Sequence, residues 1–273
     1  MDEATATGTL YLVPVPLGPE DDPLRVLPPA TVEATVALDC FVAEHARSAR
    51  AVLARLPMRR PLQEITIVEL NRNTPEERLP ELLGPLLAGR DTGLLSEAGC
   101  PAVADPGAAL VALAHRRGIR VVPLVGPSSL LLALMASGMN GQAFSFAGYV
   151  PVDPAERGER LRELERRSAS TGETVLMIET PYRTQALFDA MLETLAPTTR
   201  VGVAARLTMP GETTQSRTVD QWRALRPALE RTPTVLSLQA ERAGPPPRSR
   251  AKVRKHPGSP PGGTRAPRPG RGR

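Results

Sequence analysis

The feature that most restricts the fold is the regular alternation of short apolar runs with helical patterns along the first half of the chain. In one example, the apolar run 92–95 is followed by a loop over residues 96–107 and then by a helical pattern over 108–117. Strands that alternate with helices predict a parallel sheet covered by helices on both faces. Loop 96–107 would then follow the carboxyl end of a strand, where open α/β sheets bind their ligands.

Loop 96–107 is stiff and yet leaves its backbone accessible. It holds two Gly, two Pro and two carboxylates in twelve residues, read Ser-Glu-Ala-Gly-Cys-Pro-Ala-Val-Ala-Asp-Pro-Gly. Glycine lets a ligand approach the backbone, and proline fixes the local chain direction. The composition therefore predicts a ligand-binding loop whose charged groups are Glu97 and Asp105.

The same patterns predict two domains and a tail. Residues 8–140 are expected to form an N-terminal α/β domain with a parallel sheet, and residues 141–242 a second α/β domain with a mixed sheet. Residues 243–273 are rich in Pro, Gly and Arg, and they are expected to be disordered because they cannot bury enough apolar surface.

One helical pattern covers residues 75–88. Its leucines recur at helical spacing, which predicts a single amphipathic helix whose apolar stripe packs into the core. The stripe consists of Leu79, Leu82, Leu83, Leu86 and Leu87.

The positive charge of the chain is concentrated in its last residues. The chain has 34 Lys and Arg against 29 Asp and Glu, a net charge of +5. Residues 244–273 hold nine of the basic residues and no acidic one, so the rest has 25 basic against 29 acidic residues and a net charge of −4. This segment predicts weak, non-specific attraction to nucleic acid; a solvated segment without a partner is the alternative.

Several classes of protein are disfavoured. The chain contains neither the phosphate-binding G-x-x-x-x-G-K-[ST] nor the dinucleotide-binding G-x-G-x-x-G pattern. Its two cysteines, Cys40 and Cys100, match no metal or redox spacing, so no metal site is expected. The start of the chain lacks the pattern of a secretion signal, and the apolar run 130–136 is too short to span a bilayer. We therefore expect a soluble cytoplasmic protein without a membrane partner.

Six segments resemble, in order, motifs of the tetrapyrrole methylase superfamily. Within it the chain is most similar to the branch of the ribosomal RNA small subunit methyltransferase I proteins. The resemblance covers about residues 8–240. The six segments are residues 10–18, 43–47, 96–107, 121–129, 179–183 and 205–208.

This resemblance implies two α/β domains with S-adenosylmethionine in the cleft between them, and it suggests a homodimer. In the similar branch the methyl acceptor is a ribose 2′-hydroxyl of 16S rRNA, which makes rRNA or the small ribosomal subunit the implied partner. By motif position, the implied cofactor-binding residues are Leu17, Asp105, Ala108, Ser128, Ser129, Met177 and Leu207.

Methyl transfer from an activated sulfonium needs alignment of the acceptor and a group that takes its proton. Glu97, Glu44 and Glu179 are the candidates for this proton acceptor. For each of them, the alternative is a carboxylate that caps an adjacent helix or pairs with Arg47 or Arg183.

The chain departs from the branch on the acceptor side. It has Ala-Glu-His-Ala-Arg at 43–47 where the branch has Ala-Glu-Asp-Thr-Arg, and Ser-Glu-Ala-Gly-Cys-Pro at 96–101 where the branch has Ser-Asp-Ala-Gly-Thr-Pro. Three functions therefore stay open. They are an rRNA methyltransferase, a methyltransferase for a tetrapyrrole or another small molecule, and a catalytically silent protein that binds RNA or the ribosome.

Overall fold

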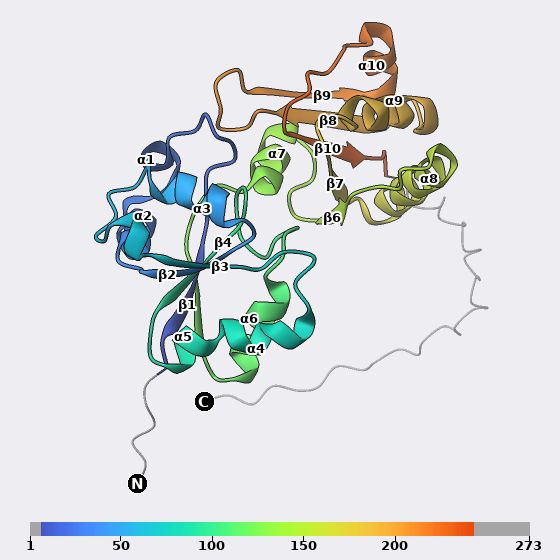
Figure 1. Ribbon diagram of the computed structural model, residues 1–273. Coiled ribbons are helices and arrows are strands. Elements are labelled where there is room, and N and C mark those ends of the chain that lie inside the picture. The colour runs from blue at the N-terminus through green and yellow to red at the C-terminus, as the bar shows by residue number, and fades with distance from the viewer. Residues whose placement is uncertain (1–6, 243–273) are drawn as a thin grey trace, which may run out of the picture. The chain divides into compact units, whose positions relative to one another are not determined.

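The computed structural model describes residues 7–242, which belong to one compact unit. The predicted tail, residues 243–273, lies outside the described residues. The described part contains two five-stranded sheets, with strand orders β3-β2-β4-β1-β5 and β6-β7-β10-β8-β9 (Figure 1). No helix among residues 7–242 has the length and apolar character needed to cross a membrane.

The first sheet is parallel throughout, as predicted. Its central strands β2 and β4 are buried along their whole length, as expected for parallel strands that have helices on both faces. All five carboxyl ends therefore lie along one edge of the sheet. The strands are β1 (Thr9–Val13), β2 (Cys40–Ala43), β3 (Thr66–Glu69), β4 (Thr92–Leu95) and β5 (Arg120–Pro123).

Helices cover both faces of this sheet (Figure 1). One face packs against α2 (Pro29–Val36) and α3 (Ala46–Leu53), which follow the short α1 (Pro23–Val26). The other face packs against the leucines of α4 (Leu79–Leu82) and α5 (Gly84–Leu87) and against α6 (Ala108–Arg116). Two 3₁₀ turns, Leu62–Glu64 and Glu76–Arg78, complete this half.

The prediction of one continuous helix over residues 75–88 is wrong. The segment instead forms a 3₁₀ turn followed by the two short helices α4 and α5. Pro80 and Pro85 explain the break, because proline lacks the N–H that an uninterrupted helix needs and is tolerated in the first turn. Four of the five leucines are buried as expected, whereas Leu87 is 41% exposed.

The second sheet is mixed, as predicted. β6 and β7 pair in parallel, and the other pairs are antiparallel, including the pair of β8 with β9. α8 (Pro154–Thr171), α9 (Thr184–Thr194) and α10 (Val219–Leu225) pack on one face, and α7 (Ser129–Ser137) on the other. The strands are β6 (Phe144–Gly148), β7 (Thr174–Glu179), β8 (Arg200–Ala205), β9 (Thr213–Thr218) and β10 (Thr234–Gln239).

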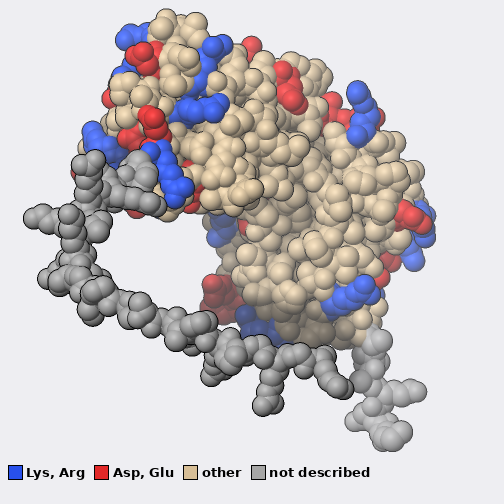
Figure 2. All heavy atoms as spheres, turned by 180° about the vertical axis from the view of Figure 1, so that it is seen from behind, with Lys and Arg blue, Asp and Glu red and all other residues tan. Residues whose placement is uncertain are grey.

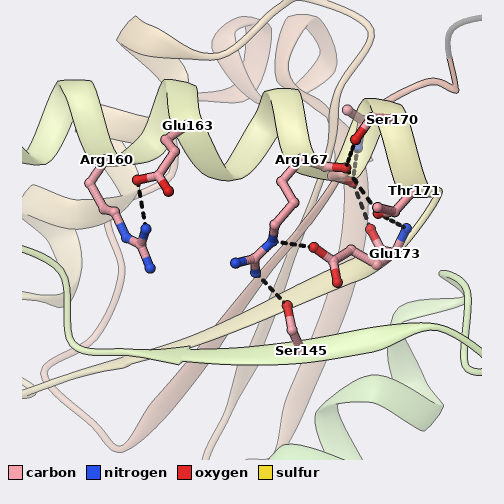
Figure 3. A network of polar contacts seen from close by, with 9 residues as sticks. Ser145, Arg160, Glu163, Arg167, Ser170, Thr171 and Glu173 are labelled. Atoms are coloured by element: carbon pink, nitrogen blue, oxygen red, sulfur yellow. Dashed lines mark hydrogen bonds and ion pairs between the residues drawn. The ribbon is translucent and has the colours of Figure 1, made fainter.

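Polar contacts attach α8 to the edge strand β6 (Figure 3). Arg167 forms an ion pair with Glu173 and donates a hydrogen bond of 2.6 Å to the hydroxyl of Ser145 in β6. The hydroxyl of Ser168 donates to the Glu173 carbonyl at 2.6 Å and accepts from the Ala240 N–H at 2.9 Å. This half-buried network fixes β6 against its neighbours, although β6 has only one paired edge.

Candidate functional site

A cavity of about 310 Å³ lies between loops of the first sheet and the inner face of the second sheet. Its volume is at the lower end of the range for small-molecule sites. The first half of the chain contributes Leu17, Ala98 and Ser129. The second half contributes mainly Tyr149, Ile178, Glu179, Thr180, Pro181, Ala204, Leu207, Met209 and Val235.

A larger hollow, of about 790 Å³, shares no residue with this cavity. It lies where β8 begins and β10 ends, among Asn140, Arg200 and Gln239, and it includes Arg242. None of the six motif segments reaches it. Because Arg242 is also the last described residue, the larger size of this hollow carries no weight as evidence for a ligand site.

Four of the predicted site residues line the smaller cavity: Leu17, Ser129, Leu207 and Glu179. Ser128 lies next to it as the N-cap of α7, where its hydroxyl accepts from the Leu131 N–H at 3.5 Å. Ala108 is exposed at the start of α6 and does not line the cavity.

Met177 is fully buried in the core on the α8 and α9 side of β7 and is not part of the cavity wall. Its neighbour Ile178 lines the cavity instead. Successive residues of a strand point to opposite faces of a sheet, so only one of the two can face the cavity. Sequence reasoning missed Ile178 and Val235. These two residues are identified by the strand register, in which Val235 of β10 lies opposite Ile178 of β7.

Two loops close one side of the cavity. Arg206, after β8, is 2.5 Å from the carboxylate of Glu20, and the hydroxyl of Thr208 donates at 2.6 Å to the buried carboxylate of Asp21. Arg206 and Thr208 both have positive φ, 54° and 70°. Such a conformation costs a non-glycine residue roughly 1–3 kcal/mol, so strain is concentrated beside the cavity.

Loop 96–107 is anchored at its start and bent sharply further on. Val15 and Gly99 exchange backbone hydrogen bonds of 2.9 and 3.1 Å, which attach it to the loop after β1. Ala102 and Ala104 adopt positive φ of 63° and 65°. These unusual conformations, with Pro106, hold Asp105 in a defined position.

We call Glu44, Glu97 and Asp105 the acidic edge. Glu44 follows β2, and Glu97 and Asp105 belong to the loop after β4, so these carboxylates meet at the carboxyl edge of the parallel sheet. Burial raises the pKa of Asp105 to about 6; the charges of Glu44 and Glu97 also raise it, whereas Arg72 lowers it. Ala98, next in sequence to Glu97, lines the cavity, whereas none of the three carboxylate residues of the acidic edge is part of the cavity wall.

Glu179 has a different environment. Its side chain is 1% exposed, and one carboxylate oxygen is 2.8 Å from the guanidinium of Arg183. The other oxygen accepts from the Thr180 N–H at 2.8 Å. Of the three proton-acceptor candidates, the structure thus places Glu44 and Glu97 near Asp105 and pairs Glu179 with Arg183.

The cavity suits a cofactor that is partly apolar and carries positive charge. Leu17, Ile178 and Leu207 offer apolar walls for a nucleoside, and Asp105, in the same loop as the lining residue Ala98, offers a carboxylate for an ammonium or sulfonium group. Among residues 7–242, no group of His, Cys, Asp and Glu is arranged to hold a metal ion.

The sequence profile of the tetrapyrrole (corrin/porphyrin) methylases matches residues 9–222. "Ribosomal RNA small subunit methyltransferase I" of Mesorhizobium japonicum is 36% identical over 77% of this chain and 67% of its own length. The protein of the same name from Xylella fastidiosa is 35% identical over 73% of this chain and 68% of its own length.

Solved structures show the same fold. Uroporphyrin-III C-methyltransferase from Thermus thermophilus, in complex with S-adenosylhomocysteine, has a TM-score of 0.51 at 22% identity and covers 85% of this chain and 97% of its own. Its bound ligand is the product form of the cofactor that the motifs imply. The chain belongs to the tetrapyrrole (corrin/porphyrin) methylase family and is an S-adenosylmethionine-dependent methyltransferase.

Proposed function

We propose that this protein transfers the methyl group of S-adenosylmethionine to a ribose 2′-hydroxyl of the small-subunit rRNA. The observation that carries the proposal is the identity of 36% with a relative named for that rRNA over most of the described chain. The acidic edge supports the transfer to a hydroxyl, because its carboxylates can accept the proton that the hydroxyl loses.

In this proposal the cofactor occupies the cavity of 310 Å³. Leu17 and Leu207 contact its apolar parts, and Ser128 and Ser129 contact it at the start of α7. Ala108 lies outside the cavity wall at the start of α6, and its proposed contact is with the part of the cofactor that extends beyond the cavity. Asp105 faces its positive charge. Met177, buried beneath Ile178, supports the wall from the core. When bound, S-adenosylmethionine supplies the activated methyl group, and the protein's task is to align the hydroxyl and accept its proton.

Glu97 and Glu44 are the proposed proton acceptors, because both belong to the acidic edge. Glu179 would first have to leave Arg183. We expect Glu97→Gln or Glu44→Gln to lower kcat by about 100-fold or more, in the range of general-base catalysis, with an unchanged Kd for S-adenosylhomocysteine. An unchanged kcat in both variants would remove the acidic edge from the proton-transfer step.

The deciding experiment offers tritiated S-adenosylmethionine with three acceptors in parallel: small ribosomal subunits, free rRNA, and an extract of small metabolites that includes tetrapyrroles. We expect label in the rRNA, at a ribose. Label in the small-molecule fraction alone would support the tetrapyrrole alternative. Binding of S-adenosylhomocysteine without any transfer would support the catalytically silent alternative.

We further propose a homodimer that works in the cytoplasm, where its ribosomal substrate is found, and a domain boundary near residue 140. The support for a dimer is a set of exposed apolar side chains on α7 and β6, which a second copy would cover. They are Leu131, Met135, Phe144 and Phe146. Light scattering during size-exclusion chromatography tests the dimer, and Met135→Glu is expected to shift it towards the monomer.

A further inference from the structure

Two exposed tyrosines belong to segments that line the cavity. Tyr149 is 50% exposed and lines the cavity, and Tyr182 is 80% exposed and directly follows Pro181, which also lines it. The chain has only three tyrosines, and the third, Tyr11, packs against the core. Tyr149 contacts what enters the cavity, and Tyr182 is the exposed aromatic residue next in sequence to its wall.

The backbone before Tyr149 is shaped to redirect the chain. The pairing of β6 with β7 shifts register between Phe146 and Gly148, and Gly148 has a φ of 69°. A bulge of this kind turns the following residues away from the ordinary strand direction. Tyr149 consequently points into the cavity mouth instead of continuing the alternation of β6.

The two segments that carry the tyrosines are joined. β6 and β7 run parallel, so both segments leave the sheet at the same edge. Arg183 connects them, because its guanidinium pairs with Glu179 at 2.8 Å and donates to the Val150 carbonyl at 3.5 Å. Tyr149 directly precedes Val150, and Tyr182 directly precedes Arg183, so each tyrosine is next in sequence to one partner of this hydrogen bond.

Arg231 adds a positive charge beside Tyr182. Its guanidinium carbon lies over the Tyr182 ring, 5.9 Å from the ring centroid, within the range of a cation–π contact. Within residues 7–242, Arg231 takes part in none of the ion pairs. Exposed aromatic rings with a nearby arginine are the combination with which proteins bind unpaired bases and the adjoining phosphates.

We propose that Tyr149, Tyr182 and Arg231 form a stacking platform for an unpaired nucleobase of the RNA substrate, beside the ribose that is presented to the cofactor. This inference rests on the proposed rRNA methylation and names the part of the RNA that the protein holds. A nucleotide carries its charge on the phosphate, where Arg231 can contact it.

The test measures binding of a fluorescein-labelled oligoadenylate of roughly 12 nucleotides, a length near one single-strand site, in the presence of S-adenosylhomocysteine. We expect Tyr149→Ala and Tyr182→Ala each to weaken binding about tenfold, the magnitude of one lost base stack. The matched Tyr149→Phe and Tyr182→Phe variants keep the ring, and we expect them to bind within about twofold of the wild type. The wild type and the alanine variants should bind an abasic oligonucleotide with the same affinity, because it has no base to stack.

Arg231→Ala is compared with Arg116→Ala, a change of the same charge on α6. Only Arg231→Ala is expected to weaken binding of the oligoadenylate. An unchanged affinity for S-adenosylhomocysteine in Tyr182→Ala shows that the variant is folded. The platform is refuted if the alanine variants bind oligoadenylate like the wild type, or if the phenylalanine variants lose as much affinity as the alanine variants.

The methylation assay separates this inference from the function on which it rests. If the wild type labels small ribosomal subunits and Tyr182→Ala does so with an unchanged KM, the platform is wrong and the proposed function stands. If the wild type labels no RNA but oligoadenylate binding still depends on the tyrosine rings, the proposed function is wrong and the platform stands.

Discussion

Asp105 is held as a carboxyl group that titrates near neutral pH. Burial, together with the charges of Glu44 and Glu97, raises its pKa from 3.8 to about 6, and Arg72 only partly offsets this. A group whose pKa is raised on folding binds protons more tightly in the folded state, so its ionised form destabilises the fold above that pKa. Such a cost is typical of a residue kept for binding.

We predict that affinity for S-adenosylhomocysteine falls about tenfold between pH 7.5 and about pH 5, because protonated Asp105 no longer attracts the ligand's ammonium group. Calorimetric titration across this range measures it. Asp105→Asn should bind weakly with a flat pH profile, and it should melt at a higher temperature than the wild type at pH 7.5. A wild-type profile that is flat as well would show that Asp105 does not face the ligand.

The pair of Glu179 with Arg183 gives a prediction about stability. Removing one partner of a buried ion pair leaves an uncompensated charge and typically costs 3–5 kcal/mol. Arg183 is about one-third exposed, so we expect Arg183→Ala to lower the free energy of unfolding by about 2 kcal/mol or more, measured by denaturant titration. Glu179→Gln should lower the free energy of unfolding by less than Arg183→Ala does, and it should leave kcat unchanged. A large loss of kcat would instead show that Glu179 is a proton acceptor.

Motif position determines side-chain direction for some of the predicted site residues and not for others. Leu17 and Leu207 lie in loops that follow strands, and Ser129 begins the helix after such a loop; all three line the cavity. Met177 lies inside a strand, where a shift of one residue reverses the direction of the side chain. Its placement needed the register of β7 with β10, which no local pattern contains.

At the scale of elements, close backbone contacts hold the strand ends together. A Cβ added at Gly126, in the loop between β5 and α7, would lie 2.3 Å from the Cβ of Pro14 in the loop after β1. A Cβ added at Gly84, at the start of α5, would meet no atom within 4 Å. Glycine is thus required by space at the first position and not at the second.

We predict that Gly126→Ala lowers the free energy of unfolding by roughly 1–3 kcal/mol, the usual cost of overpacking, and weakens binding of S-adenosylhomocysteine. Gly84→Ala, the matched control, should leave both quantities unchanged or slightly improve stability. Thermal and denaturant unfolding, with calorimetry for the ligand, measure the difference. Equal stability of the two variants would mean that the loops adjust freely and that the contact does not position the site.

Local sequence patterns predict whether most segments are helix or strand. They do not always predict whether a helix is unbroken. β2 and β4 were predictable because their apolar runs are short and bounded by loops. Over residues 75–88 the leucine spacing predicts one helix, but Pro80 and Pro85 interrupt it, so two short helices form. Leu87 lies beyond the second proline, near the end of α5, and is partly exposed.

For the whole molecule, the distribution of charge separates cofactor binding from RNA binding. Acidic and basic side chains are interspersed on the face shown in Figure 2 and form no continuous basic surface there. The sequence outside residues 244–273 carries a net charge of −4, which repels a polyanion at long range. The nine basic residues of that terminal segment are therefore the main sequence feature that can attract RNA non-specifically.

We predict that deleting residues 243–273 leaves the melting temperature and the Kd for S-adenosylhomocysteine unchanged, because the site is built within residues 7–242. Measured at low salt, the deletion variant should bind free rRNA more weakly than the wild type. Its log Kd should also depend less steeply on log salt concentration, since fewer counterions are released from the phosphates. A variant with the nine basic residues changed to Gln at full length is the matched control and should behave like the deletion. An unchanged salt dependence in both variants would place RNA attraction on the folded part, where Arg231 and the two exposed tyrosines would then have to supply it.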